Sequence, residues 1–369
     1  MSHPPRILML VEACAQHPRH GGASMIQLKN GSIFLAWMES GQSEMLAGDD
    51  APFDIVAMTS CDGGSTWGNR QDLIRRGPND TAAYKPSFLR LQSGEILFRY
   101  EMYHHFVQGE DRNISAYVCK SADECQTFSD PVTLWRCSDR LTGSMNDVRQ
   151  LSTGRIVVPV ELITGKALEN DGEDLSPTDW GMSGTFYSDD EGQTWSQCDN
   201  YIYLPMRGAS EPKIEELRNG QLVMVMRTQL GSVFQSTSKD GGRSWSTAQT
   251  TGLIAPESCP ALARNSRNGD LFLVWNHSAY DPRFDHYGKR TPLSVAISTD
   301  DGQTWDKIKN IETDPEWEFT NPAPIITDQG TMLIAYEASK YDRLEHPGKL
   351  GRSRMHLKLA VIDLDWLYA

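Results

Sequence analysis

The residues Ser298-Thr299-Asp300-Asp301-Gly302-Gln303-Thr304-Trp305 form a short motif that recurs along this chain of 369 residues. Three other copies share its serine, aspartate, glycine and tryptophan positions, and a fourth is degraded and ends in phenylalanine: Ser60–Trp67, Ser188–Trp195, Ser238–Trp245 and Ser121–Phe128. Successive copies begin 50 to 67 residues apart. A fixed motif at a nearly constant long spacing indicates a repeat architecture.

Each copy of the motif is typical of a turn between two strands. An aspartate carboxylate can accept hydrogen bonds from backbone N–H groups, and a glycine supplies a positive φ. The tryptophan adds a large apolar anchor beneath the neighbouring strands. The apolar residues before two of the copies, 54–59 and 292–297, read as strands that enter the turn. Five copies cannot share one active site, so we interpret these aspartates as structural.

A second pattern, an apolar strand, a turn with glycine and another apolar strand, occurs six times. The turn glycines are Gly31, Gly94, Gly154, Gly220, Gly269 and Gly330. Strand pairs repeated at this spacing predict an all-β fold, a six-bladed β-propeller with four-stranded blades. We expect residues 1–369 to form this single domain. The lone N-terminal strand at residues 6–11 would pair with residues 355–363, which closes the sixth blade and removes an exposed edge.

The composition limits the function classes. A net charge of −14 argues against nucleic acid and anionic membranes as partners. The seven cysteines form no C-x-x-C pair and no phosphate-binding loop is present, so we expect neither a metal nor a cofactor. The apolar run at residues 7–11 is too short for a secretory segment, and no stretch could span a bilayer. We therefore expect a cytoplasmic protein, and the oligomeric state is left open.

Charged and amide residues recur at the strand ends, at fixed distances from the hairpin glycines. Counting nine residues back and seven residues forward gives Lys85, Glu101, Glu161, Glu211, Arg227, Asn276, Asn321 and Glu337. The start of the first strand and the end of the second lie side by side in a hairpin, so these residues are predicted at one rim of the central channel. Such a ring is either a ligand site or a water-filled mouth with satisfied ion pairs.

The S-x-D-x-G-x-T-W turns resemble the Asp-boxes of sialidases (neuraminidases), and the resemblance covers nearly the whole chain. It implies an exo-acting glycoside hydrolase that cleaves a terminal carboxylated sugar, with sialic acid as the leading candidate. Asp-boxes also occur in non-hydrolytic propellers. A non-catalytic carbohydrate- or protein-binding propeller, a polysaccharide lyase and another glycosidase on the same fold are therefore kept as alternatives.

The resemblance also implies roles for individual residues. Glu211 matches the glutamate that supports the sialidase nucleophile, and Arg227, sixteen positions later, matches the second of three arginines that hold the substrate carboxylate. Arg19 and Arg290 stand nearest to the first and third arginines. The acid/base aspartate is expected on the loop before the first Asp-box, at Asp50, then Asp54, then Glu44 or Asp49. The further predicted substrate contacts are Lys85, Asn146, Asn276 and Asn321.

The sequence departs from sialidases at Asn321, where the resemblance places the nucleophilic tyrosine. Three routes are open: Tyr84 or Tyr336 reaches the site, Glu211 activates a water directly with inversion, or the protein binds its ligand without hydrolysis. In the alternative interpretation of the rim, Arg227 and Arg290 only form ion pairs with glutamates. The chain is most similar to a sialidase-like branch marked by Asn146-Asp147, Glu211-Pro212, Met226-Arg227-Thr228 and the run 289–293.

Overall fold

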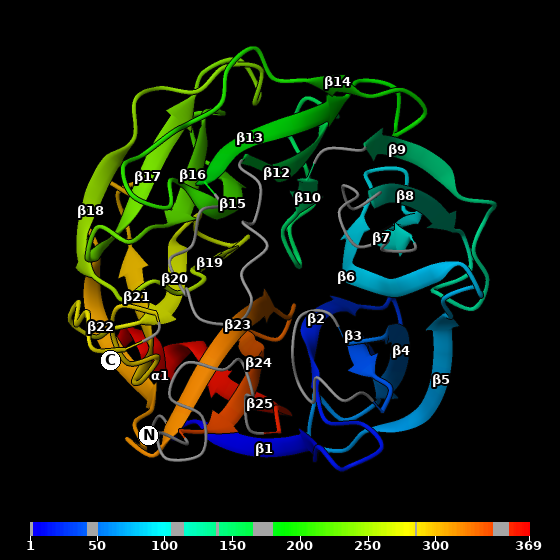
Figure 1. The fold of residues 1–369 in the computed structure, drawn as a ribbon, viewed down its shortest axis with the longest axis horizontal. Helices are drawn as coiled ribbons and strands as arrows, with labels where there is room; N and C mark the ends of the chain where they lie inside the picture. The colour runs from blue at the N-terminus through cyan, green and yellow to red at the C-terminus, as the bar shows by residue number, and fades with distance from the viewer. Residues whose placement is uncertain are drawn as a thin grey trace, which may run out of the picture.

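The computed structural model describes residues 3–42, 51–104, 114–137, 140–164, 180–284, 286–341 and 354–369. Its strands form six antiparallel sheets that surround a central axis like the blades of a propeller (Figure 1). The described part of the chain contains no helix long and apolar enough to cross a bilayer. The predicted all-β, six-bladed β-propeller is confirmed.

In each blade the first strand lies nearest the axis and the last strand lies at the outer edge (Figure 1). Blade 1 contains β2 (His20–Gln27), β3 (Ile33–Ser40), β4 (Phe53–Ser60) and β5 (Gly68–Ile74). Blade 2 contains β6 (Asp80–Arg90), β7 (Ile96–His104), β8 (Ile114–Ser121) and β9 (Val132–Cys137). Blade 3 contains β10 (Arg140–Gly143), β11 (Arg149–Gln150), β12 (Ile156–Thr164), β13 (Trp180–Ser188) and β14 (Ser196–Gln197). Blade 4 contains β15 (Ser210–Glu216), β16 (Leu222–Arg227), β17 (Ser232–Ser238) and β18 (Gln249–Ile254). Blade 5 contains β19 (Ala261–Arg264), β20 (Leu271–Asn276), β21 (Leu293–Ser298) and β22 (Asp306–Glu312).

The sixth blade joins the two ends of the chain. It contains β23 (Trp317–Ile326), β24 (Thr331–Lys340), β25 (His356–Asp363) and, as its outer strand, β1 (Arg6–Val11). β1 pairs antiparallel with β25, with Arg6 opposite Val361 and Met9 opposite Lys358. A short helix, α1 (Leu364–Tyr368), follows β25. The predicted closure of the sixth blade by the N-terminal strand is therefore confirmed.

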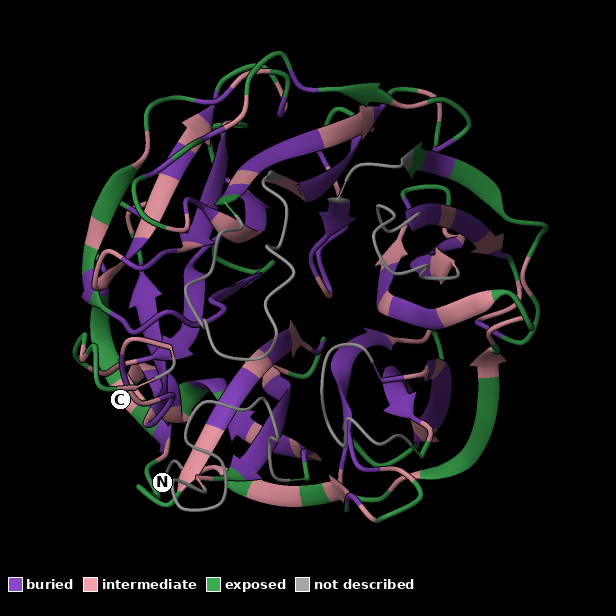
Figure 2. Cartoon of the chain, in the orientation of Figure 1, coloured by how far each residue is buried: buried purple, intermediate pink, exposed green. Residues whose placement is uncertain are grey.

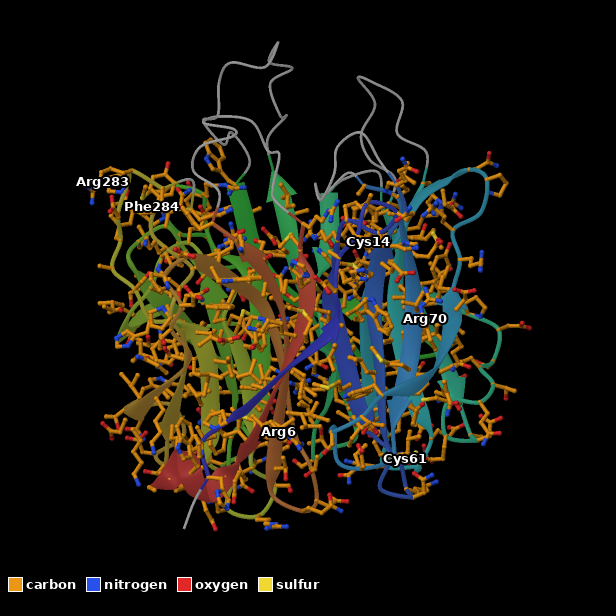
Figure 3. All side chains as sticks on the ribbon, turned by 90° about the horizontal axis from the view of Figure 1, so that it is seen from below. Arg6, Cys14, Cys61, Arg70, Arg283 and Phe284 are labelled. Atoms are coloured by element: carbon orange, nitrogen blue, oxygen red, sulfur yellow. The ribbon has the colours of Figure 1, made fainter. Side chains whose placement is uncertain are left out.

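The turn motifs have the structural role that their sequence indicates. In the first copy, Asp62 Oδ1 accepts hydrogen bonds from the backbone N–H groups of Ser65 (3.0 Å) and Thr66 (2.8 Å). These bonds, with one from the Thr66 hydroxyl to Oδ2, lower the pKa of Asp62 to about 2. Figure 3 shows Cys61 of this turn at one face of the propeller and Cys14 and Arg283 at the opposite face.

The hydrophobic core is divided among the blade interfaces. One large cluster of buried apolar side chains lies between each pair of neighbouring blades. Figure 2 shows the strands near the axis as mostly buried and outer strands such as β5 and β18 as largely exposed. Between blades 6 and 1, for example, Trp37 of β3 and Leu333 of β24 are buried in one cluster, against which Leu8 and Leu10 of β1 pack. Each blade is therefore stabilised by its neighbours, and the ring has to be closed.

Because β1 completes the sixth blade, its removal should lower the stability of the protein. Deletion of residues 1–12 exposes the edge of β25 and removes the contacts of Leu8 and Leu10 with the interface cluster. Several half-buried apolar side chains are lost, each contributing about 1–2 kcal/mol to stability. Their loss should lower the melting temperature by roughly 10 °C. Thermal unfolding followed by circular dichroism measures this change.

A matched control separates the effect of the strand from that of the polar contact of Arg6. Arg6 donates a hydrogen bond to Ser65 Oγ at 2.7 Å, and this contact is exposed. Arg6→Ala should therefore change the melting temperature by no more than about 2 °C. An unchanged melting temperature after the deletion would show that the ring does not depend on β1.

Candidate active site

The innermost strands carry a bulge at the channel rim. Lys85, Glu211 and Asn321 have φ values of 56°, 49° and 52°, and Gly22 has 59° at the same place in blade 1. The pairing register shifts at each of these positions, for example between Ser210 and Lys213. A positive φ is unfavourable for residues with a Cβ, and bulges near functional sites redirect side chains. The bulge therefore fixes where three of the predicted ring residues point.

The other two blades depart from this pattern. In blade 3 the positive φ, 51°, falls on Asn146, one residue after the position that the count from Gly154 gives. In blade 5 the equivalent residue is Pro260, whose ring fixes φ near −65°. The pairing of β19 with β20 begins at Ala261, directly after this proline. Cys259, directly before this proline, takes the place at the rim.

Glu211 and Arg227 meet as predicted from their spacing. Arg227 Nη1 lies 3.0 Å from Glu211 Oε2, and Nη2 lies 2.8 Å from Glu257 Oε1. Arg207 Nη1 also donates to Glu257 Oε1 at 2.8 Å. The Glu257 side chain is only 4% exposed, while that of Glu211 is 25% exposed. Glu257 is therefore an internal anion for two arginines, and Glu211 is the carboxylate that reaches the channel.

A chain of hydrogen bonds continues from Glu211 across the rim. The Cys259 thiol contacts both Glu211 Oε2 and, at 2.9 Å, Asn321 Oδ1. Asn321 Nδ2 donates to Glu337 Oε1 at 2.6 Å. Arg19 Nη2 lies 3.2 Å from Glu337 Oε2. Blades 4, 5, 6 and 1 are thus connected through side chains that approach one point of the axis.

Arg290 belongs to the same network and is held by Asn276. Arg290 Nη2 donates to the Glu257 carbonyl at 3.1 Å, and Nη1 lies 3.3 Å from Thr320 Oγ1. Asn276 Nδ2 donates to the Arg290 carbonyl at 2.9 Å and to the Phe319 carbonyl at 3.0 Å. The amide of Asn276 is therefore used between strands, at a residue that is 1% exposed. The structure thus gives Asn276 a role in holding the backbone of Arg290, and its predicted contact with a substrate is not supported by this position.

The opposite side of the rim is built around Lys85. Its Nζ donates to Thr142 Oγ1 at 2.6 Å and to the Gly143 carbonyl at 3.0 Å, and Thr142 in turn donates to Glu101 Oε2. Glu161 Oε2 accepts a hydrogen bond from the Glu211 backbone N–H at 3.2 Å. The structure therefore brings the predicted ring residues of blades 2, 3 and 4 together.

The ring surrounds a small pocket. Its lining residues are Lys85, Ser144, Met145, Glu211, Lys213, Cys259, Asn321 and Pro322. Lys213 and Cys259 were not among the residues predicted from the sequence. Lys213 lies two residues after Glu211 on the same inner strand, and Cys259 precedes a proline at a counted ring position, so both carried a weak local signal. Pairing between blades, which the sequence does not show, brings them to the same pocket.

The charges of the pocket residues are set by burial and by their neighbours. Burial opposes ionisation of Glu211, but the Arg227 guanidinium and the Cys259 thiol outweigh it and lower the pKa of Glu211 to about 2. Burial and the neighbouring Glu211 carboxylate raise the pKa of Glu161. Burial alone would lower the pKa of Lys85, but Tyr103 and the nearby glutamates raise it. At neutral pH Glu211 is therefore an anion and Lys85 a cation.

The acid/base candidates are only partly described. Asp50, Asp49 and Glu44 lie outside the described residues. Asp54 is described, and its Oδ1 accepts a hydrogen bond from the Arg76 backbone N–H at 3.0 Å and lies 3.4 Å from Arg76 Nη1. Asp54 belongs to β4, the third strand from the axis, so the structure does not bring it to Glu211. Asp50 stays a prediction.

Two tyrosines considered as replacements for the missing nucleophile lie elsewhere. Tyr336 is fully buried between blades 5 and 6, and its hydroxyl donates to Glu312 Oε1 at 2.7 Å. Tyr84 is 6% exposed and stacks on Tyr103, with ring centroids 4.7 Å apart. The route through Tyr336 is therefore wrong, because its side chain faces the interface core. The structure gives Tyr84 a packing role and does not place it beside Glu211.

Asn146 lies below the pocket. Its Oδ1 accepts from Ser24 Oγ at 3.0 Å and its Nδ2 donates to the Pro324 carbonyl at 3.3 Å. It lines a second, more open cavity of about 190 Å³ further along the channel, together with Arg149 and Glu215. Its predicted substrate contact is therefore not supported by its position. Across the described ranges, no group of three or more histidine, cysteine and acidic residues could hold a metal ion.

The sequence of the chain matches one family model and a curated relative. The family model described as a BNR repeat-like domain matches residues 31–334. A curated sialidase from Bacteroides fragilis (strain YCH46) is 25% identical over 247 residues, which cover 63% of this chain and 41% of the relative. The chain thus spans less than half the length of this curated relative.

Solved structures of similar shape share little sequence with the chain. A protein of unknown function from Dyadobacter fermentans superposes with a TM-score of 0.72 at 18% identity, covering 98% of both chains. The NanB sialidase from Streptococcus pneumoniae gives 0.73 at 12% identity, covering 98% of this chain and 71% of its own. A leech intramolecular trans-sialidase complexed with 2,7-anhydro-Neu5Ac gives 0.71 at 14%, covering 100% and 71%. At these identities the structural likeness shows the fold.

The lowered pKa of Glu211 predicts a contribution to stability that depends on pH. A carboxyl whose folded pKa lies below its unfolded value of about 4.3 stabilises the protein above that value, and the contribution is lost as pH falls through about 2. Glu211→Gln should therefore lower the free energy of unfolding by about 1–3 kcal/mol at pH 7, and the difference should shrink below pH 4. Urea unfolding at constant ionic strength measures it.

Asp199→Asn is the matched control for this series. Asp199 pairs with Arg243 at 3.0 Å, and both side chains are exposed, so the substitution should change stability little at any pH. A difference between wild type and Glu211→Gln that stays constant from pH 7 to pH 3 would contradict the assigned ionisation.

Proposed function

Since the chain belongs to the BNR repeat-like family within the sialidase superfamily, we propose that it is an exo-acting glycoside hydrolase that removes a terminal carboxylated sugar. The observation that carries the proposal is the contact of Glu211 with Arg227 at a pocket on the propeller axis. Arg290 and Arg19 belong to the same network of side chains. This arrangement combines a carboxylate with several guanidinium groups at one end of the channel.

The arginines supply the recognition chemistry. A guanidinium group binds a carboxylate through two parallel hydrogen bonds, and arginine stays charged at any physiological pH. Arg227 is 13% exposed, and its Nε has no hydrogen-bond partner among the described residues. We assign the contact with the carboxylate of the sugar to this guanidinium group. The more distant negative charges of the chain oppose an anionic ligand only weakly here, because salt screens charges beyond about 8–10 Å.

Glu211 supplies the anion that hydrolysis requires. Cleavage of a glycosidic bond passes through an oxocarbenium-like state, in which positive charge develops on the sugar ring. A carboxylate that stays ionised down to about pH 2 and faces the pocket stabilises this charge. Protonation of the leaving oxygen is assigned to Asp50 on the resemblance to sialidases alone.

Sialic acid is the proposed sugar. The curated relative is a sialidase, and structures of similar fold include a trans-sialidase complexed with 2,7-anhydro-Neu5Ac. Sialic acid carries the carboxylate that a cluster of arginines would recognise. A non-catalytic sugar-binding propeller is the second candidate. It is favoured by Asn321, because an amide cannot replace the tyrosine that attacks the anomeric carbon in sialidases.

A substrate screen tests the proposed class. We expect turnover of a 4-methylumbelliferyl glycoside of a carboxylated sugar, with the α-sialoside as the first candidate and uronides as the comparison. Mass spectrometry of the products distinguishes hydrolysis, which adds water, from elimination, which leaves an unsaturated sugar. Binding of the free sugar without turnover of any glycoside would instead support the non-catalytic propeller.

Two substitutions test the roles of the central pair. Glu211→Gln keeps the shape and removes the charge, so it should lower kcat by a factor of about 10² or more while the sugar still binds. Arg227→Lys keeps the charge and removes the planar two-bond contact, so it should mainly raise KM. Steady-state kinetics and calorimetric binding separate these effects. Equal and mild effects of both changes would mean that the two residues form a structural ion pair.

A further inference from the structure

Lys213 is a lysine inside the pocket, and no carboxylate of the described residues is bonded to it. It lies on β15, two residues after the bulge at Glu211, and is 6% exposed. Its Nζ donates to the backbone carbonyl of Met145 in blade 3, so the side chain crosses from blade 4 towards blade 3. Lys213 and Met145 line the pocket beside Glu211. The amine is therefore held at the bottom of the proposed binding site.

The charged groups around Lys213 favour and oppose its cationic form unequally. Asp147 and Glu211 favour its cationic form, the neighbouring Cys259 acts in the same direction, and Arg149 opposes it. Asp147 is itself 1% exposed, and within the described residues neither of its carboxylate oxygens has a hydrogen-bond partner. Arg149 is bound to Glu215 at 2.7 Å. Burial is the dominant influence, and it lowers the pKa of Lys213 to about 8.

The other ionisable groups that line the pocket are poor proton acceptors near neutral pH. The pKa of Glu211 is about 2, because Arg227 and Cys259 outweigh its burial, so its carboxylate binds a proton weakly. Burial raises the pKa of Cys259 to about 12, which keeps the thiol protonated. Lys85 stays cationic and donates to Thr142 and Gly143. A general base works best when its pKa lies near the working pH, a condition that Lys213 meets.

We propose that Lys213 is the general base of this pocket and activates a water molecule, which attacks in place of the tyrosine that is absent at Asn321. The proposal rests on the proposed hydrolytic function. The neutral amine of Lys213 takes a proton from a water molecule, and the water oxygen forms a bond to the anomeric carbon while the bond to the leaving oxygen breaks. The leaving oxygen takes a proton from solvent water. The Lys213 ammonium then releases its proton to solvent, and the sugar leaves with inverted configuration.

This role is distinct from the roles of its neighbours. Glu211, on the same strand, provides the stationary negative charge for the oxocarbenium-like state, while Lys213 moves the proton. A lysine that only balanced the charges of Asp147 and Glu211 would be replaceable by arginine, which stays protonated and cannot act as a base. The two roles can therefore be separated by substitution.

The kinetic test uses the glycoside that the wild-type protein turns over. For wild type, kcat/KM should rise with pH and level off above about pH 8, as the amine of Lys213 loses its proton. Lys213→Arg and Lys213→Gln should lower kcat by about 10² or more and lose this rising limb. Ethylamine should partly restore the activity of Lys213→Ala. Lys29→Gln, a change at an exposed lysine bound to Glu124, is the control and should leave kcat unchanged.

A second measurement detects the ionisation of Lys213 without any turnover. A lysine with a lowered folded pKa binds more protons in the unfolded chain between about pH 8 and about 10.4, so wild type gains stability with rising pH there. The melting temperature of wild type relative to Lys213→Met should therefore increase from pH 7.5 to pH 10. The same comparison with Lys29→Met should show no such trend.

The outcomes separate the two proposals. Full activity of Lys213→Arg, or a wild-type pH profile that Lys213→Gln preserves, overturns the general base while hydrolysis itself stands. A difference in melting temperature that does not change with pH overturns the assigned ionisation and the base with it. If wild type cleaves none of the glycosides, the proposed function fails and the base fails with it, even where the melting series shows a titrating amine. Product with retained configuration also overturns the single-step route through Lys213.

Discussion

The bulge on the innermost strand is the backbone constraint on which the site depends. It places Lys85, Glu211 and Asn321 in the left-handed region, at equivalent positions of three blades. Such conformations are unfavourable for residues with a Cβ and persist only where the surrounding structure holds them. Here the adjacent strands of each blade and the interface clusters hold them. The regular propeller thus presents a ring of side chains that a set of flat, regular hairpins would direct elsewhere.

The electrostatic network depends on these positions. Burying a charge is unfavourable unless an opposite charge or several hydrogen bonds compensate it. Glu257 meets this condition by accepting from Arg227 and Arg207, and Glu337 meets it with Arg19 and Asn321. The internal glutamates hold the arginines in place and leave Glu211 and Lys213 at the pocket, in the arrangement expected of a site organised before its ligand arrives.

Stability and recognition are located at different parts of the molecule. The Asp-box turns are held by hydrogen bonds within each turn, as at Asp62, and the turn of Cys61 lies at the face opposite to that of Arg283 (Figure 3). The six interface clusters join the blades. Side chains at the rim contribute little to these clusters, so rim residues such as Asn321 can differ between propellers of the same fold.

The sequence alone determined the six hairpins, the closed sixth blade and the meeting of Glu211 with Arg227, because each follows from local strand and turn patterns or from the spacing across one hairpin. Only the tertiary structure decided which residues of different blades share the pocket. Lys213 and Cys259 are 46 residues apart and come together through blade packing. Tyr336 faces an interface core because both faces of its strand pack on neighbouring blades: Tyr336 lies in the cluster with blade 5, and Ala335 lies in the cluster with blade 1. Pro260 cannot adopt the positive φ of the bulge in other blades, and Cys259, directly before it, lines the pocket.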